Sequence, residues 1–176
     1  MVQFPVPPDM ERMDEFAAAP DQTGIWCPHV TVACVIADGD DFLMVEEDIH
    51  GELRFNQPAG HLEAGETLQA AAHRETLEET GWEIALDHFI GVQQWNSPVH
   101  RHHIVRFAFA GHPLRHHPDR SLDRGIARAL WMSYGEIAAA ASRLRSPLVL
   151  TTVDDWLAGQ RLPLTALRSL LPAGGA

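Results

Sequence analysis

The sequence predicts an α/β domain with a layered α/β/α architecture, in which helices cover both faces of a mixed β-sheet. Its length of 176 residues and its hydrophobic content of 45% suit one globular domain with a sizeable core. Apolar, β-branched segments lie on both sides of a central helical segment, and further helical segments close the chain. Strands and helices in this order favour a sheet packed between layers of helices.

The first part of the chain predicts an arm followed by a β-hairpin. Residues 1–24 hold four prolines and show no clean periodicity, so we expect an N-terminal arm outside a domain that covers residues 25–171. His29–Ala37 is apolar and rich in β-branched residues, which predicts a buried strand. Gly39–Asp41 is typical of a hairpin turn, and Phe42–Glu47 is then the return strand.

The middle of the chain predicts a glycine-rich loop over Ala59–Glu66 and a helix over Thr67–Thr80. Thr67 suits the N-cap because its hydroxyl can accept a hydrogen bond from a free backbone N–H group of the first turn. Gly81 suits the position after the helix, where the backbone often adopts the left-handed conformation. Capping residues at both ends make this the best-defined helix of the sequence.

The second half predicts three more strands and two helices. The predicted strands are Ile84–Trp95, His103–Ala110 and Ala127–Met132, with a loop over Asn96–His102. The predicted helices are Tyr134–Leu144 and Ser146–Ala158, the second with Ser146 as its cap and Pro147 at its first position. We expect residues 172–176 to be a flexible tail.

Composition and charge restrict the function. The formal net charge is −11, and all 13 basic residues are arginines. An acidic surface repels nucleic acid, so we expect no nucleic-acid partner. The lack of lysine excludes Schiff-base chemistry and a P-loop. Any site for phosphate on such a chain needs a local remedy, such as a bound cation.

The sequence also predicts a cytoplasmic protein. No apolar run approaches the roughly 18 residues of a membrane helix, and the N-terminus does not read as a signal peptide. Cys27 and Cys34 do not form a disulfide framework, which fits a reducing compartment. Cys34 lies within an apolar run, which indicates a buried free thiol.

The predicted central helix carries a constellation of acidic residues. Glu75, Glu78 and Glu79 are spaced by three and four residues, so their carboxylates share one helical face. Clustered carboxylates repel one another, and a hard divalent cation such as Mg²⁺, or Mn²⁺ as a substitute, removes that repulsion. The alternative is a solvated acidic face with an Arg74–Glu78 ion pair.

The segment Gly60–Trp82 resembles the Nudix box, G-x5-E-x7-R-E-U-x-E-E-x-G-U, in which U is a bulky apolar residue. Its fixed positions are filled by Gly60, Glu66, Arg74, Glu75, Glu78, Glu79 and Gly81, with Trp82 at the final U. Thr76, at the first U, is smaller and more polar than usual, and we expect it to affect the packing of the helix rather than metal binding. The resemblance implies a Nudix fold and a Mg²⁺-dependent hydrolase that directs water at phosphorus.

The resemblance also implies a role for each residue of the box. Glu78 and Glu79 would bind the metal, and Glu75 would be a further ligand or the base that activates water. Arg74 would orient Glu75, so the implied catalytic group is Arg74, Glu75 and Glu79. The implied structural residues are Gly60, where the backbone approaches the metal, Glu66, which braces the loop, and Gly81.

Beyond the box, residues 28 to about 165 resemble the NudJ-type phosphatases of this family. Pro28–Val35, Asn56–Ala64 and Leu144–Val149 carry much of the likeness. It implies hydrolysis of thiamine pyrophosphate, hydroxymethylpyrimidine pyrophosphate and nucleoside di- or triphosphates. Two alternatives stay open, a pyrophosphatase of ADP-ribose or a modified nucleotide, and a Nudix-fold ligand sensor without catalysis. We expect a small-molecule partner and a monomer or homodimer.

Residues near the box are candidates for substrate binding. Phe55 and Trp95 are expected to flank strand ends, where their rings could stack on a substrate ring. Arg54 and Arg101 are expected in loops, where each could bind phosphate. Their expected loop positions favour these two arginines over Arg106, which lies in the middle of a predicted strand. Gln57 joins this set of candidates.

A further metal ligand outside the box is common among related chains. The acidic candidates here are Glu46, Glu47, Asp119, Asp123 and Glu136. For each of them, an ordinary surface acid is the interpretation that the sequence favours.

Overall fold

The structure is a computed structural model that describes residues 26–97 and 103–171. The predicted arm over residues 1–24, the tail over residues 172–176 and Arg101 lie outside the described residues. No helix within the described ranges is long and apolar enough to cross a membrane.

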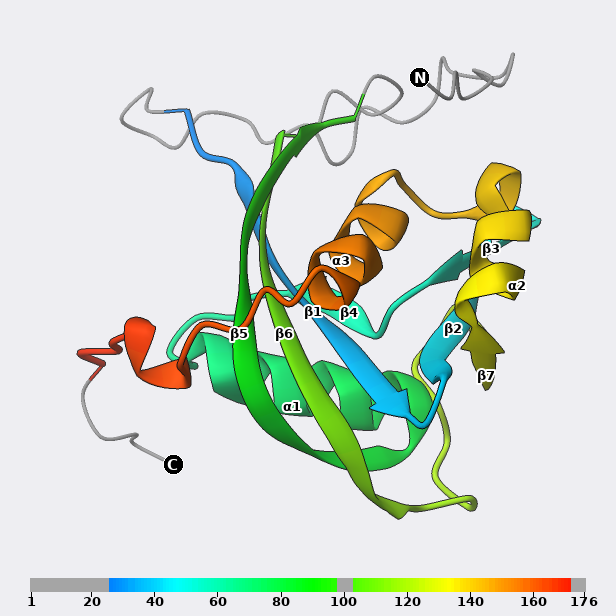
Figure 1. The fold of residues 1–176 in the computed structure, drawn as a ribbon, viewed down its shortest axis with the longest axis horizontal. Helices are drawn as coiled ribbons and strands as arrows, with labels where there is room; N and C mark the ends of the chain where they lie inside the picture. The colour runs from blue at the N-terminus through cyan, green and yellow to red at the C-terminus, as the bar shows by residue number, and fades with distance from the viewer. Residues whose placement is uncertain (1–25, 98–102, 172–176) are drawn as a thin grey trace.

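The described residues form one mixed sheet of seven strands (Figure 1). The strands are β1 (His29–Asp38), β2 (Asp41–Ile49), β3 (Glu52–Asn56), β4 (Ala59–His61), β5 (Trp82–Asn96), β6 (His103–His116) and β7 (Ile126–Ser133). The order is β3-β2-β1-β6-β5, with β4 also paired to β1 and β7 to β2. β1 and β6 are parallel, whereas the other pairs are antiparallel.

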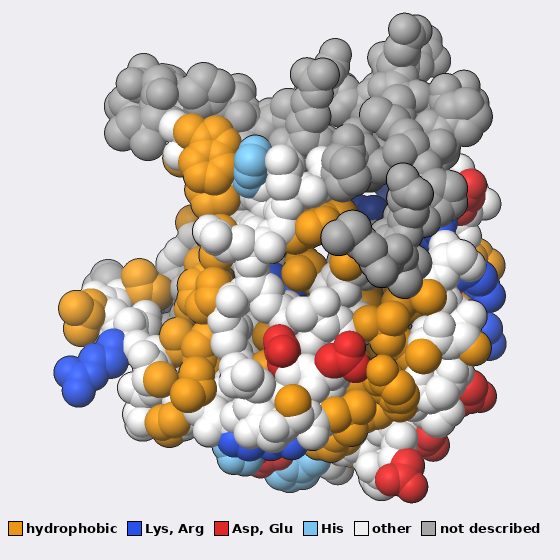
Figure 2. Space-filling view, turned by 45° about the horizontal axis from the view of Figure 1, so that its top comes forward, with side chains coloured by type: hydrophobic (Ala, Val, Ile, Leu, Met, Phe, Trp, Pro, Cys, Tyr) orange, Lys and Arg blue, Asp and Glu red, His pale blue; other side chains and the backbone are white. Residues whose placement is uncertain are grey.

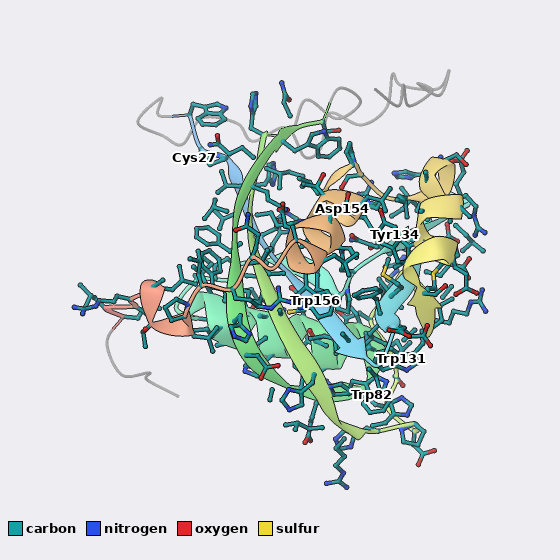
Figure 3. All side chains as sticks on the ribbon, viewed as in Figure 1. Cys27, Trp82, Trp131, Tyr134, Asp154 and Trp156 are labelled. Carbon is teal, nitrogen blue, oxygen red and sulfur yellow. The ribbon has the colours of Figure 1, made fainter. Side chains whose placement is uncertain are left out.

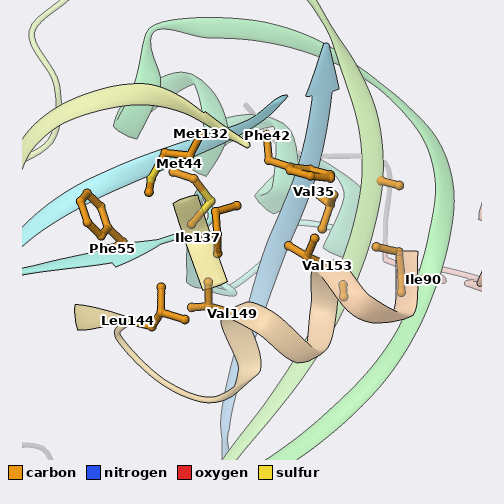
Figure 4. Close-up of a cluster of buried hydrophobic side chains, with 12 residues drawn as sticks. Val35, Phe42, Met44, Phe55, Ile90, Met132, Ile137, Leu144, Val149 and Val153 are labelled. Atoms are coloured by element: carbon orange, nitrogen blue, oxygen red, sulfur yellow. The ribbon is translucent and has the colours of Figure 1, made fainter. Parts of the chain in front are cut away.

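Helices cover both faces of the sheet. They are α1 (Leu68–Thr80), α2 (Tyr134–Ala139) and α3 (Leu148–Leu157). Because side chains alternate along a strand, β1 sends Val35 into a cluster with α2 and α3 (Figure 4) and Ile36 into a second cluster with α1. The predicted α/β/α sandwich with a mixed sheet is therefore confirmed.

The two helices on the same face are tied together by side chains. The Tyr134 hydroxyl of α2 donates to a carboxylate oxygen of Asp154 on α3 at 2.9 Å (Figure 3). Trp156 of α3 packs edge-on against Phe42 of β2, with 5.4 Å between the ring centres. These contacts join α2 to α3 and hold α3 against β2.

The structure confirms the ends of α1 and the buried thiol. Thr67 accepts a hydrogen bond from the Ala70 backbone N–H at 3.1 Å, and Gly81 has a φ of +70°. Cys34 is buried, and burial raises the pKa of its thiol to about 12, whereas Cys27 is exposed. The two cysteines are not joined by a disulfide.

Several predicted boundaries were wrong. The predicted loop over Ala59–Glu66 contains β4, and β3 was not predicted. Strand β6 runs to His116, six residues past the predicted end at Ala110, because it pairs with β5 as far as Trp82. All three errors concern strands that pairing with other strands stabilises.

The helix predicted over Tyr134–Leu144 is shorter. It ends at Ala139 and is followed by a 3₁₀ turn over Ala141–Arg143. The chain turns there because Leu144 enters the core and pairs with Phe55, and the Arg145 N–H donates to the Phe55 carbonyl at 2.8 Å.

Ser146 does not cap α3. Pro147 occupies the cap position with no side-chain hydrogen bond, and α3 begins at Leu148. The Ser146 hydroxyl is buried, with no hydrogen-bond partner among the described residues.

Candidate active site

Helix α1 presents two buried carboxylates to the protein interior. Glu75 and Glu79 are one turn apart and only 9% and 8% exposed. They share their face with buried Ala71 and Ala72, which pack against the sheet. Glu78 is half-buried at the edge of this face. The expected clustering on one face is present, and it is not a solvated acidic surface.

Arg74 links the carboxylates of the helix to the preceding loop. Its Nη1 donates to Glu75 at 2.8 Å and to Glu78 at 3.1 Å. Its Nε and Nη2 donate to Glu66 at 3.1 and 2.7 Å, and Nη2 also donates to the His61 carbonyl at 3.0 Å. The guanidinium therefore fixes the Glu75 carboxylate in position.

Glu66 braces the loop from the other side of Arg74. Its carboxylate accepts a hydrogen bond from the Glu63 backbone N–H at 2.7 Å. The hydrogen bonds from Arg74, with a smaller contribution from the Glu63 N–H, hold the pKa of Glu66 below its usual value.

Burial disfavours the ionised forms of Glu75 and Glu79. It raises the pKa of Glu75 and places the pKa of Glu79 well above its usual value, although Glu79 accepts a hydrogen bond from the Ala59 N–H at 2.8 Å. Negative charge on Glu47 and Asp123 raises the pKa of Glu79 further. The cluster is thus short of positive charge.

Gly60 allows the backbone to lie against this cluster. Strand β4 pairs with β1, Gly60 opposite Val32, and this brings the Gly60 backbone onto the Glu75 carboxyl group. A Cβ atom at Gly60 would lie 2.1 Å from that carboxyl group. Only glycine leaves room for a carboxylate at this point.

The donor set fits a divalent cation. Carboxylate oxygens are the ligands that hard cations prefer, and a cation would relieve the raised pKa values of Glu75 and Glu79. Within the described part of the chain, no three His, Cys, Asp or Glu side chains converge as a metal site, and Arg74 bonds to both Glu75 and Glu78. A cation would take over the charge balance that Arg74 now supplies.

Thr76 takes no part in the acidic cluster. It is fully buried, and its hydroxyl donates to the Ala72 carbonyl one turn earlier at 2.8 Å. Its effect is on the packing of the helix, in line with the expectation from the sequence.

A cavity of about 320 Å³ adjoins the buried carboxylates. Glu79 lies on its wall, together with Glu47 from β2, Trp95 from β5 and Arg106 from β6. Arg145, from the segment before α3, closes another side. Carboxylates and guanidinium groups therefore face one space.

Most of the predicted substrate residues lie elsewhere. Trp95 lines the cavity, and Arg101 lies outside the described residues. Phe55 is 5% exposed and packs in the core beneath Arg143, so its ring cannot stack on a ligand there. Arg54 forms an ion pair with Glu52 and donates to the Ser142 carbonyl at 2.7 Å.

Gln57 does not line the cavity, although its Oε1 accepts a long hydrogen bond of 3.5 Å from Arg106. It is 1% exposed, and its amide donates to the Val149 carbonyl of α3 at 2.6 Å. The formation of β3, which the sequence did not indicate, sets the directions of Arg54 and Phe55. In each case a structural contact has replaced the predicted contact with substrate.

Of the arginines that line the cavity, Arg106 was considered and ranked below Arg54 and Arg101, and Arg145 was not among the candidates. Arg106 is 5% exposed, and burial lowers the pKa of its guanidinium to about 10. Its position in the middle of a strand had favoured Arg54 and Arg101 instead. The signal was present in the sequence, because an arginine within an apolar strand must either find a partner or serve a ligand.

The acidic residues outside the box fall into different settings. Glu47 lines the cavity beside Glu79, accepts a hydrogen bond from Asn56 at 2.7 Å, and has a pKa raised by burial. Glu46 is buried on the other side of the strand, where it pairs with Arg128 and Arg143 at 2.7 Å each. Neither is an ordinary surface acid.

The other acidic candidates do not reach the cavity wall. Asp123 lies close enough for its charge to raise the pKa of Glu75 and Glu79. Asp119 lines a separate surface cavity, and Glu136 completes the capping box of α2 with Ser133. Glu47 and Asp123 are therefore the candidates that lie near the carboxylates of the helix, and of these two Glu47 also lines the cavity.

The fold and this site define a hydrolase that acts on pyrophosphate bonds. The family model described as the NUDIX domain matches residues 28–151. The chain belongs to the Nudix hydrolase family, whose members generally use divalent metal ions and act on small-molecule phosphates.

Individual relatives agree with this assignment. The chain is 47% identical over 137 residues to Phosphatase NudJ of Escherichia coli K12, which covers 78% of this chain and 88% of that protein. A NUDIX hydrolase from Nitrosomonas europaea superposes with a TM-score of 0.82 at 42% identity, over 84% of this chain and all of that one.

More distant structures share the fold alone. A bifunctional NMN adenylyltransferase/ADP ribose pyrophosphatase from Francisella tularensis has a TM-score of 0.63 at 21% identity, over 76% of this chain and 41% of that chain.

Proposed function

We propose that the chain is a Mg²⁺-dependent phosphatase of small pyrophosphorylated metabolites. The substrates of this class are thiamine pyrophosphate, hydroxymethylpyrimidine pyrophosphate and nucleoside di- and triphosphates, and the product is orthophosphate. The observation that carries the proposal is that Glu79 lines the same cavity as Arg106 and Arg145. A cation held by carboxylates and an anion held by guanidinium groups would then be neighbours.

The metal ligands in this proposal are Glu75, Glu78 and Glu79, with Glu47 as the candidate outside the box. A bound divalent cation supplies positive charge that neutralises the phosphate oxygens and makes phosphorus easier to attack. Mg²⁺ suits a site that offers only carboxylate oxygens and leaves coordination positions for substrate phosphate.

The residues of the chain position and deprotonate the attacking water. Glu75 is the carboxylate of this set that Arg74 orients, and it is the candidate to accept the proton of the water. Arg74 holds this carboxylate at 2.8 Å, and the Ala59 N–H holds Glu79 at 2.8 Å. Both contacts remove the need to reorganise the site during attack at phosphorus.

Orthophosphate release from thiamine pyrophosphate and nucleoside diphosphates with Mg²⁺ tests the proposal, beside chromatographic detection of AMP formed from ADP-ribose. Glu79→Gln is the inactive control. Orthophosphate from the first two substrates by the native chain alone supports it. Cleavage of ADP-ribose alone would replace the substrate class by that of an ADP-ribose pyrophosphatase. No turnover of any substrate would favour a ligand sensor.

A further inference from the structure

Buried polar atoms without partners gather around the cavity. Among the described residues, no hydrogen bond reaches the hydroxyl oxygens of Thr31 and Ser146, the Nε of Arg106 or the Oδ1 of Asn56. All four residues line the same cavity of about 320 Å³. Such atoms are few in folded proteins, and each costs free energy when it is withdrawn from water unpaired. Their convergence on one cavity indicates a polar occupant.

The sheet places two of these groups side by side. Thr31 of β1 and Arg106 of β6 are partners in the parallel register, so their side chains leave the same face of the sheet at neighbouring positions. Ser146 approaches from the segment before α3 and also lines the cavity. These hydrogen-bond donors thus come from three separate segments of the chain and line one cavity.

The cavity wall holds acidic side chains and arginines in equal number, and it is the buried guanidinium of Arg106 that indicates an anion. Arg106 forms no ion pair within 4.0 Å among the described residues, and the hydrogen bond that it donates to the Gln57 Oε1 is long at 3.5 Å. Arg145 adds a second guanidinium, 3.4 Å from Glu47. A buried guanidinium without a close carboxylate is costly unless a ligand satisfies it.

We propose that Arg106 and Arg145, with the hydroxyl groups of Thr31 and Ser146, form a subsite for the terminal phosphate of the substrate. This inference rests on the proposed function and deepens it. A terminal phosphate has three free oxygens and close to two negative charges, so it can use two guanidinium forks and two hydroxyl donors. A phosphate within a diester such as ADP-ribose has two free oxygens and one charge, and it satisfies fewer of these groups.

Two variants and one control test the subsite. Arg145→Gln removes a charge from an exposed side chain, and Arg106→Met removes the buried charge at similar volume. The control is Arg128→Gln, which changes the net charge equally outside the cavity. Calorimetric titration with inorganic phosphate, without divalent metal, measures binding independently of hydrolysis.

We expect each cavity variant to weaken phosphate binding by about 10- to 100-fold, the range for charge-assisted hydrogen bonds. KM for thiamine pyrophosphate should rise by a similar factor, with kcat within about threefold for Arg145→Gln, because ground-state and transition-state binding are lost together. Arg106→Met should melt no lower than the native chain, because it removes an unpaired buried charge. Arg106→Lys should restore part of the binding.

Unchanged phosphate affinity in both cavity variants would overturn the subsite, and so would an equal loss in Arg128→Gln, which would indicate net charge alone. A lower melting temperature of Arg106→Met with intact phosphate binding would assign that arginine a structural role. A native chain that binds phosphate but hydrolyses nothing would refute the proposed function and leave the subsite standing.

Discussion

Replacing Gly60 by alanine should inactivate the enzyme without unfolding it. The added Cβ would lie 2.1 Å from the carboxyl group of Glu75, whereas ordinary contact begins at 3.4 Å. The carboxyl group must therefore retreat by about 1.3 Å, a distance at which catalytic groups lose on the order of 100-fold in rate. It would also leave the hydrogen bond of 2.8 Å that Arg74 donates to it.

Stability should change little, because the obstructing atoms are the end of a flexible side chain. The matched contrast is Gly111→Ala, whose Cβ would also meet an atom at 2.1 Å, but this atom is the backbone oxygen of Ala85. Because the backbone of a paired strand cannot move without breaking the sheet, Gly111→Ala should lose about 1–3 kcal/mol in the free energy of unfolding. Gly91→Ala, with nothing within 4 Å, is the neutral control.

Urea denaturation and kcat for thiamine pyrophosphate, measured on all three variants, separate the two effects. Gly60→Ala should match Gly91→Ala in the denaturation midpoint and fall about 100-fold below it in kcat. A Gly60→Ala variant with native activity would refute the placement of the Glu75 carboxylate. If it unfolds as readily as Gly111→Ala, the assumption that the carboxylate can move is wrong.

Three further predictions concern the helix and its loop. Arg74 lowers the pKa of Glu66, so their ion pair stabilises the fold at any pH above the ordinary carboxyl pKa. This stabilisation is lost as the pH falls through the lowered pKa of Glu66. Glu66→Gln should therefore reduce the free energy of unfolding in urea by about 1–2 kcal/mol at pH 7 and by little in acid. Burial raises the pKa of Glu79, so the metal-free chain should melt lower as pH rises from the ordinary carboxyl pKa toward the raised one. Added Mg²⁺ should offset that loss, and Glu79→Gln should reduce both effects in scanning calorimetry. Thr76→Val should keep kcat within about twofold and raise stability by up to about 1 kcal/mol, because a buried hydroxyl that bonds back to its own helix adds little; a loss of Mg²⁺ affinity would contradict the assigned packing role.

Helix α1 was predictable because local signals agree along its whole length. Thr67 and Gly81 mark its ends, and the spacing of Glu75 and Glu79 places both carboxylates on the face that also holds the buried alanines. Each of these signals acts within one or two turns of helix. The burial of the carboxylates follows from the same periodicity, so the core of the site could be inferred from the sequence.

The short strands could not be inferred in this way. β3 and β4 are five and three residues long and form because β2 and β1 lie ready to pair with them. Without β3, Phe55 was expected at a strand end near the box and Arg54 in a loop. With it, the pleat of the strand turns Phe55 into the core and Arg54 away from the cavity.

The arginine of the cavity shows how far local position can mislead. Loops carry many binding residues, and that rule favoured Arg54 and Arg101 over Arg106. Yet a loop arginine keeps its hydration at no cost, whereas an arginine inside an apolar strand loses it. The costlier position is the more informative one, because a chain keeps such a residue only where something satisfies it.

The distribution of charge in the cavity also bears on how a substrate binds. A chain of net charge −11 repels anionic substrates, and acidic side chains lie scattered over the face shown in Figure 2. Inside the cavity, the charges of Arg106 and Glu79 attract each other, but no ion pair within 4.0 Å joins them in the described structure. We interpret this separation as the requirement of the substrate itself. A phosphate that carries a cation presents positive charge to Glu79 and negative charge to Arg106, so one ligand can pair with both groups. If Glu79 and Arg106 formed an ion pair with each other, neither would be available to the ligand.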